Sequence, residues 1–305
     1  MINIWGRPHE PAIIFLCTCT QLIYIKEKIM RKTLGIIITI MFFAGSAGIT
    51  LPANAYAAEN QKEYQNTRYA EGGIYEGLYQ ETIYYHSRQE AYYKIDPALP
   101  GYPTNTCGLT AGGNIVGWYN HLYPELFPGH TAMITYFGTD FWASPTPALA
   151  AGFNQLESDM GITSAGVTIS GYLGGLNTYV TGKGRTFSSS SVMGSGGALL
   201  NSSYKTELKK DRLMTIFVDG FNIMDITNIK SYPSLGYDKV TMEKYSGAHV
   251  MAVYGYYELT YLDSGKNLLS KDIYLIVHTG FGSLLGMIRL TSQCTLDAAY
   301  ITYIY

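Results

Sequence analysis

A change in hydrophobic period along the chain constrains its fold more than any other feature of the sequence. Apolar and small residues recur at helical spacing in two early stretches, at 107–121 and 147–160. Runs that read as β-strands follow in the last third: 213–218, 249–254, 273–278 and 299–304. Helices followed by strands are typical of α+β domains with segregated layers. We therefore predict an α+β fold in which an N-terminal helical region packs on an antiparallel sheet.

Glycine, proline and polar residues predict where these elements end. Turns are expected between the strands, at 219–220, 246–247, 263–265 and 280. Residues 61–69 have weak helical character, and glycines at 167–180 precede a further short helix. The serine-rich and glycine-rich stretches read as a flexible polar interval, at 188–191 and 194–197.

Residues 30–57 have the pattern of a secretory signal peptide. A basic start precedes an apolar run at 34–43, and small residues follow, so we expect cleavage after Ala55 or Ala57. The alternative is a transmembrane anchor, which fits less well because glycine and serine interrupt the apolar stretch and a cleavage pattern follows. The protein is accordingly expected to be secreted, without a C-terminal anchor.

Two segments flank this signal. Residues 1–29 lie upstream of a complete signal that begins at Met30, so we expect translation to start at Met30 and the upstream segment to be misassigned. Residues 58–100 are polar and tyrosine-rich over most of their length and then proline-rich. They are interpreted as an N-terminal extension or a prosegment, and the alternative is that they are simply part of the domain.

Composition excludes several classes of protein. The formal net charge is −2, and no basic stripe or arginine cluster is present to neutralise phosphates, so nucleic acid is not an expected partner. Without the leader only Cys107 and Cys294 remain, which makes a disulfide framework improbable. No cysteine or histidine spacing is typical of a zinc site, so we expect neither a metal nor another cofactor.

Cys107 is the candidate nucleophile. It stands where a proline-rich loop enters a predicted helix. At a helix N-terminus the unsatisfied amide groups and the helix dipole favour an anion, so a thiolate there is stabilised. The same amides can stabilise an oxyanion beside the sulfur. The alternative for a lone cysteine is an inert residue of the core.

His249 is the candidate general base. It is predicted to open a strand directly after the Ser246-Gly247 turn, at the rim of the sheet. A base at that place can face a helix terminus and form the nucleophile–base pair that thiol catalysis requires. The alternative is a structural histidine.

These residues lie in a wider resemblance. Residues 106–111 (Thr-Cys-Gly-Leu-Thr-Ala), followed by an aromatic pair at 118–119, resemble the nucleophile helix of bacterial C39-like, papain-fold cysteine peptidases of the type secreted by Firmicutes. Residues 248–256 (Ala-His-Val-Met-Ala-Val-Tyr-Gly-Tyr) resemble the histidine strand of that family, and residues 123–128 and 175–180 resemble its secreted members. The resemblance implies a papain-like domain over 101–305 that cleaves a peptide or protein substrate.

The chain departs from the family pattern at three positions. Leu109 replaces the usual proline after the Cys-Gly pair. The family places asparagine or aspartate after the next strand to orient the histidine, whereas this chain has His278 or, alternatively, Thr279 there. For the oxyanion hole no upstream glutamine is evident, and Asn105 is the nearest amide side chain.

The functional prediction is an exported cysteine peptidase that uses a Cys-His dyad or an atypical triad. Two alternatives stay open. One is a papain-fold binding module that has lost turnover, and the other is a cysteine amidase that acts on cell-wall peptide. The sequence does not determine the substrate, the cleavage specificity or the oligomeric state.

Overall fold

The computed structural model describes residues 63–65, 68–70, 73–95, 107–130, 147–280, 286–290 and 294–305, all of which belong to one compact unit. The expected leader at 30–57, the upstream segment at 1–29 and Asn105 lie outside the described residues. The α-helices of the described part are α2 (Cys107–Asn120), α3 (Pro147–Met160), α4 (Ile169–Gly182) and α5 (Asn201–Leu208).

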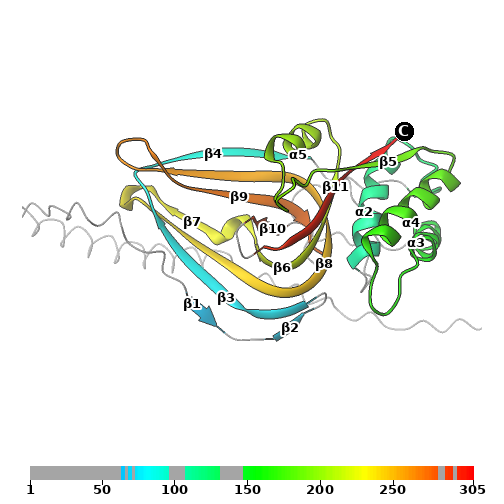
Figure 1. Ribbon diagram of the computed structural model, residues 1–305, viewed down its shortest axis with the longest axis horizontal. Coiled ribbons are helices and arrows are strands. Elements are labelled where there is room, and N and C mark those ends of the chain that lie inside the picture. Colours follow the sequence, from blue (N-terminus) through cyan, green and yellow to red (C-terminus); the bar gives the residue numbers. More distant parts are fainter. Residues whose placement is uncertain are drawn as a thin grey trace, which may run out of the picture. The chain divides into compact units, whose positions relative to one another are not determined.

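Eleven strands of the described chain form one antiparallel sheet. They are β1 (Glu63–Gln65), β2 (Arg68–Ala70), β3 (Gly73–Tyr84), β4 (Ser87–Lys94), β5 (Phe187–Ser191), β6 (Met214–Met224), β7 (Ile229–Tyr232), β8 (Tyr237–Leu262), β9 (Leu268–His278), β10 (Gly286–Arg289) and β11 (Leu296–Ile304). Short 3₁₀ turns flank β7: η2 (Ile226–Asn228) and η3 (Pro233–Leu235). The predicted α+β class with an antiparallel sheet is confirmed, and α2, α3 and α4 lie together beside one end of the sheet (Figure 1).

Strand β8 organises the sheet. It is 26 residues long and pairs with β3, β4, β6, β7 and β9. Its two ends meet at the turn between β3 and β4. There the Tyr85 N–H donates to the Gly236 carbonyl at 2.7 Å, and the His86 N–H donates to the Leu262 carbonyl at 2.9 Å. The strand therefore doubles back, and its two halves enclose part of the core between them (Figure 1).

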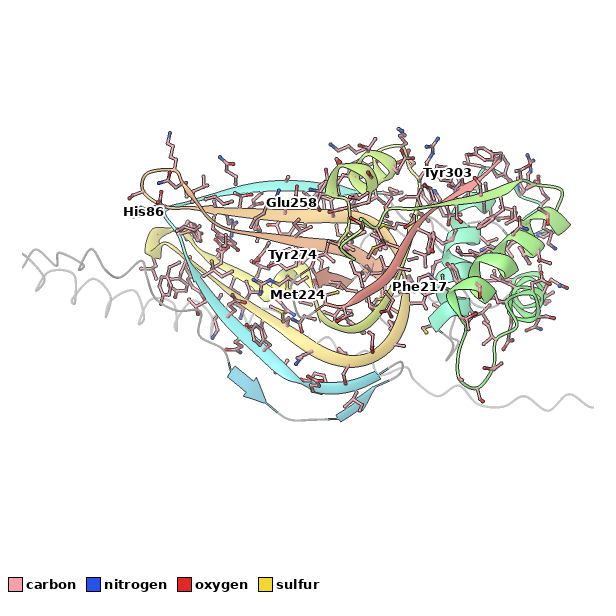
Figure 2. The ribbon with its side chains drawn as sticks, in the orientation of Figure 1. His86, Phe217, Met224, Glu258, Tyr274 and Tyr303 are labelled. Atoms are coloured by element: carbon pink, nitrogen blue, oxygen red, sulfur yellow. The ribbon has the colours of Figure 1, made fainter. Side chains whose placement is uncertain are left out.

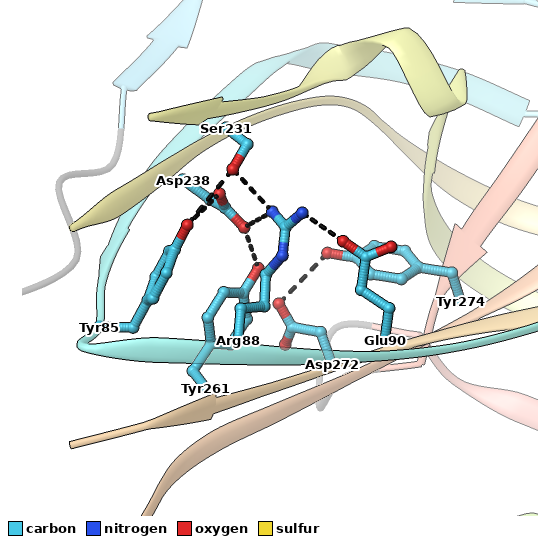
Figure 3. A network of polar contacts seen from close by, with 8 residues as sticks. All are labelled: Tyr85, Arg88, Glu90, Ser231, Asp238, Tyr261, Asp272 and Tyr274. Carbon is cyan, nitrogen blue, oxygen red and sulfur yellow. Dashed lines mark hydrogen bonds and ion pairs between the residues drawn. The ribbon is translucent and has the colours of Figure 1, made fainter. Parts of the chain in front are cut away.

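Buried charges fasten the two ends of β8 together (Figure 3). Asp238 is fully buried near the start of β8, and its carboxylate accepts from Arg88 at 2.6 Å. It also accepts from the Tyr261 hydroxyl at 2.9 Å and from the Tyr85 hydroxyl at 3.2 Å. Tyr261 lies near the far end of the same strand. We name this group, consisting of Asp238, Arg88, Tyr85 and Tyr261, the Asp238 clasp.

A second buried ion cluster lies in the same interior. Arg289 of β10 donates to both carboxylate oxygens of Asp272 at 2.8 Å, and it also pairs with Glu81 of β3. The Tyr274 hydroxyl donates to Asp272 at 3.2 Å. Burial raises the pKa of Asp272 against the opposing effect of Arg289. The cluster joins β3 to β9 and β10, and Glu81 and Arg289 are 208 positions apart in the sequence.

Helix α2 is buried on almost every side because its glycines admit close neighbours. A Cβ at Gly113 would lie 2.2 Å from Phe153 of α3, and one at Gly112 would lie 2.4 Å from Met160. A side chain at Gly113 would force the Phe153 ring to move, and one at Gly112 would displace the end of the Met160 side chain. Glycine has low helix propensity, so this helix depends on tertiary packing. That packing holds the N-terminus of α2 in a fixed place.

Several local predictions were wrong. Residues 63–65 and 68–70 are strands, where helical character was expected, and residues 187–191 form β5. Residues 219–220 and 246–247 are not turns: they lie inside β6 and β8. Gly220 and Gly247 have φ values of 92° and 103°, and both lie at or beside irregularities in the pairing, so the strands bulge there and continue. Helix α5 was not predicted.

Candidate active site

Cys107 is the first residue of α2, as predicted. Its side chain is partly buried, and both Cys107 and Cys294 are reduced thiols. Cys107 therefore stands at the helix terminus whose first-turn amide groups have no partner within the helix itself. Helix α2 packs against β8, the strand that carries His249.

His249 lies in the interior of β8, and the prediction that it opens a strand was wrong. The strand continues through residues 246–247 because Gly247 adopts a positive φ, which lets the chain bulge without turning back. His249 consequently stands opposite Val218 of β6 and is only 3 % exposed. The imidazole is held inside the sheet, away from its rim.

The main chain of Thr279 orients the His249 ring. Nε2 lies 2.7 Å from the Thr279 carbonyl oxygen. A carbonyl only accepts hydrogen bonds, so Nε2 carries the proton and donates it in this contact. In the neutral ring Nδ1 is then the nitrogen with the lone pair. Burial lowers the pKa of His249 to about 4, although the bond to Thr279 opposes this effect, so the ring is neutral at pH 7.

Aromatic rings hold His249 on one face. Phe221 of β6 stacks on the imidazole with ring centroids 5.5 Å apart, and Tyr245 of β8 stacks on Phe221 at 5.3 Å. Tyr75 of β3 contacts Tyr245 at 5.5 Å. We call these four rings, including His249 itself, the aromatic stack. They restrict rotation of the imidazole, and no sequence pattern indicated this role for Phe221.

His278 does not occupy the place that was predicted for an orienting residue. It stands opposite Ala252 of β8, and directly paired residues share a face of the sheet. His249 lies three positions before Ala252 along a regular stretch of strand, so it faces the other way. The assignment of His278 as the orienting residue was therefore wrong. Thr279, the alternative, contacts His249 through its main-chain oxygen, so the side chain that the prediction invoked is not the group involved.

The residues that follow β9, Thr279 and Gly280, lie close to the start of α2. Gly280 directly follows Thr279 and has a φ of 75°, which favours glycine. A Cβ at Gly280 would lie 3.9 Å from the Thr110 methyl group in the first turn of α2. The segment directly after β9, which carries the partner of His249, therefore lies close to the helical turn that begins with Cys107.

Cys294 has a different environment from Cys107. It directly precedes the region of β11 and packs partly buried against the hydrophobic core. Burial raises the pKa of the Cys294 thiol to about 12, so this thiol is protonated at neutral pH. Among the residues that the structure describes, no three His, Cys, Asp or Glu side chains are grouped so that they could hold a metal ion.

The burial of His278 predicts how the stability of the protein depends on pH. It is buried, neither ring nitrogen has a hydrogen-bond partner among the described residues, and burial lowers its pKa from 6.5 to about 4. The unfolded chain binds this proton near pH 6.5 and the native state only near pH 4, so stability is lost as pH falls between these values. The difference corresponds to about 3 kcal/mol for this residue.

We expect His278→Leu to lose about 3 kcal/mol less stability than the unaltered protein between pH 7 and pH 4. Urea unfolding followed by circular dichroism at several pH values measures this difference. His86→Leu, which removes an exposed imidazole and leaves His278 in place, is the matched control. Equal pH dependence in the His278 variant and the unaltered protein would contradict the prediction.

Comparisons with models of protein families, with curated proteins and with solved structures found no match to this chain. The papain-like resemblance seen in the sequence therefore stays a prediction.

Proposed function

We propose that this chain is an exported cysteine-type peptidase of papain-like fold, in which Cys107 is the nucleophile and His249 the general base. One observation carries the proposal: the 2.7 Å contact between His249 Nε2 and the Thr279 carbonyl. It assigns the ring proton to Nε2 and leaves Nδ1 as the basic nitrogen. A main-chain carbonyl then has the orienting role that a carboxylate or amide has in a triad.

In the first step His249 Nδ1 takes the proton of the Cys107 thiol as the sulfur attacks the carbonyl carbon of a peptide bond. The carbonyl π electrons move to oxygen, and the amide groups at the start of α2 stabilise that oxyanion in the proposed mechanism. The intermediate collapses as the carbon–nitrogen bond breaks. The leaving amine takes the proton from His249, and an acyl group remains on the sulfur as a thioester.

In the second step water hydrolyses the thioester. His249, neutral again, accepts a proton from water as the oxygen attacks the acyl carbon. The carbon–sulfur bond breaks, and the proton returns from the imidazole to the sulfur. Burial of His249 favours the neutral ring, so the ring enters each step with a lone pair on Nδ1 and readily gives up the proton that it has taken. The aromatic stack keeps the ring in one orientation throughout the cycle.

Iodoacetamide should alkylate Cys107 much faster than Cys294 near pH 7. The N-terminus of α2 favours a thiolate at Cys107, whereas the pKa of Cys294 is about 12. We expect a rate ratio of at least about a hundredfold, because the thiolate is the reacting species. Peptide mass spectrometry of a time course measures both sites in the same sample.

A matched pair of variants separates reactivity from accessibility. Cys294→Ser should leave the rate at which Cys107 is labelled unchanged. His249→Gln should slow the labelling of Cys107, because the group that takes the thiol proton is removed. Equal rates at the two cysteines would contradict the proposed nucleophile. Selective labelling without hydrolysis of any peptide or cell-wall peptide would instead favour the binding module.

A further inference from the structure

Three turns meet at the end of the sheet that lies away from α2, α3 and α4 (Figure 1). They are the turn between β3 and β4, the η3 turn and the loop between β8 and β9. Two consecutive residues of the β3–β4 turn hold the three turns together. The Tyr85 N–H donates to the carbonyl of Gly236, which follows η3, and the His86 N–H donates to the carbonyl of Leu262, where the β8–β9 loop begins. Figure 2 shows His86 at this end of the sheet.

Leucines are unusually exposed on these turns. Leu235 of η3 is 64 % exposed and Leu268 at the start of β9 is 63 % exposed. They are the two most exposed large hydrophobic side chains of the described residues, and the neighbouring Leu269 is 46 % exposed. We call Leu235, Leu268 and Leu269 the apolar tip. Because more than half of the Leu235 and Leu268 side chains is exposed, burial in the core of this chain does not account for their apolar character.

Directly behind Leu235 is a row of tyrosines on the outer face of the sheet. Tyr84, Tyr237 and Tyr232 come from three adjacent strands and stand opposite one another. The ring centroids of Tyr84 and Tyr237 are 5.6 Å apart, and those of Tyr237 and Tyr232 are 4.7 Å apart. All three tyrosines are partly exposed. We call them the tyrosine row.

Behind the tyrosine row lies a pair of lysines. Lys230 of β7 and Lys239 of β8 stand directly opposite each other, two positions from Tyr232 and Tyr237. Two residues of a strand span about 7 Å, which is the spacing of the two rows. Neither lysine forms an ion pair within the described part of the chain. Like charges placed directly opposite destabilise a sheet, so the pair is suited to an anionic partner.

We propose that this end of the sheet docks on the surface of a bilayer that contains anionic lipids. From the tip inward the order is leucine, then tyrosine, then lysine. Apolar side chains partition into the acyl region, tyrosine rings prefer the headgroup level, and lysines attract anionic headgroups. The three layers of the protein thus follow the three layers of the membrane interface. This docking is independent of the proposed peptidase activity.

The leucines distinguish a bilayer from a soluble polyanion. An anionic polysaccharide or a nucleic acid would use the lysines and could stack on the tyrosines, but it offers no apolar phase for Leu235 and Leu268. No helix among the described residues has the length and apolar character needed to cross a membrane. The proposed docking involves the apolar tip, the tyrosine row and the lysine pair.

A fluorescent probe at the tip tests the proposal in the full chain. All four cysteines are replaced by serine, and Ser234→Cys beside Leu235 is labelled with an environment-sensitive nitrobenzoxadiazole dye. With vesicles that contain phosphatidylglycerol we expect the emission to shift to the blue and to rise. With pure phosphatidylcholine vesicles the response should be much weaker. The same dye at Leu122→Cys, a position 54 % exposed on the helical side, should show no shift.

Two further variants decide the outcome. Leu235→Ser with Leu268→Ser should lower the vesicle partition coefficient by about tenfold or more, since two apolar side chains no longer enter the bilayer. Lys230→Gln with Lys239→Gln should remove the preference for phosphatidylglycerol. The proposal is overturned if the probe does not respond to either vesicle. It is equally overturned if the response survives the leucine substitutions and soluble dextran sulfate reproduces it.

Discussion

Cys107→Ala is expected to abolish hydrolysis of a peptide substrate, and His249→Gln to lower it by on the order of a thousandfold or more. The first substitution removes the nucleophile. The second keeps the ring's approximate size and polarity but removes the nitrogen that takes the thiol proton. Initial rates on quenched fluorescent peptides measure both, with circular dichroism to confirm that each variant is folded.

The controls for this experiment separate side-chain from main-chain roles. Thr279→Val keeps the shape of the side chain and the carbonyl that accepts from His249, so it should retain most of the activity. His278→Gln should also retain it, because His278 faces away from His249. A large loss in the Thr279 variant would show that its hydroxyl has the orienting role. Full activity of Cys107→Ala would refute the proposed nucleophile.

Asp238→Leu is expected to destabilise the protein by about 3–5 kcal/mol, the largest stability effect that we predict for a single residue. The substitution leaves Arg88 without its buried partner and removes the acceptor of the Tyr261 and Tyr85 hydroxyls. Urea unfolding measures the change in free energy. Glu76→Gln, which breaks the more exposed pair with Lys244, should cost less than about 1 kcal/mol.

A double variant tests the mechanism of that loss. Arg88→Met combined with Asp238→Leu removes both charges, so part of the stability should return relative to Asp238→Leu alone. The cost of the single variant would then arise mainly from the charge left behind. If the single variant loses less than Glu76→Gln, the Asp238 clasp does not hold the two ends of β8 together.

The sequence predicted those elements whose pattern is local. Helices α2 and α3 begin and end almost where the apolar spacing indicated, and β9 and β11 contain the predicted runs. Strand β5 was not predicted, because its serines have little preference for strands. They are extended because they pair with β11. The length of β8 was missed for a related reason. Ser246-Gly247 reads as a turn, whereas Gly247 adopts a positive φ within a strand that continues.

In the candidate site, too, some residues could be predicted from the sequence and others could not. Cys107 was visible because a cysteine at the start of a helix has a distinctive chemistry. The orienting group was not visible, since every residue has a carbonyl and only the fold selects the one at Thr279. Phe221 was missed because its contact with His249 depends on the pairing of β6 with β8. The search for a third side chain led to His278, which strand alternation places on the opposite face.

The doubled-back strand also sets the order in which the chain can fold. Arg88 of β4 and Asp238 of β8 are separated by 150 positions, and Tyr85 and Asp238 by 153. During synthesis from the N-terminus, β3 and β4 therefore emerge long before the strand that receives them. Contacts at such separation form slowly, and unpaired strand edges expose a chain to aggregation in the meantime. Strands β3 and β4 pair with β8 and not with each other, so the edges of residues 73–94 that β8 will cover stay open until that strand has been made.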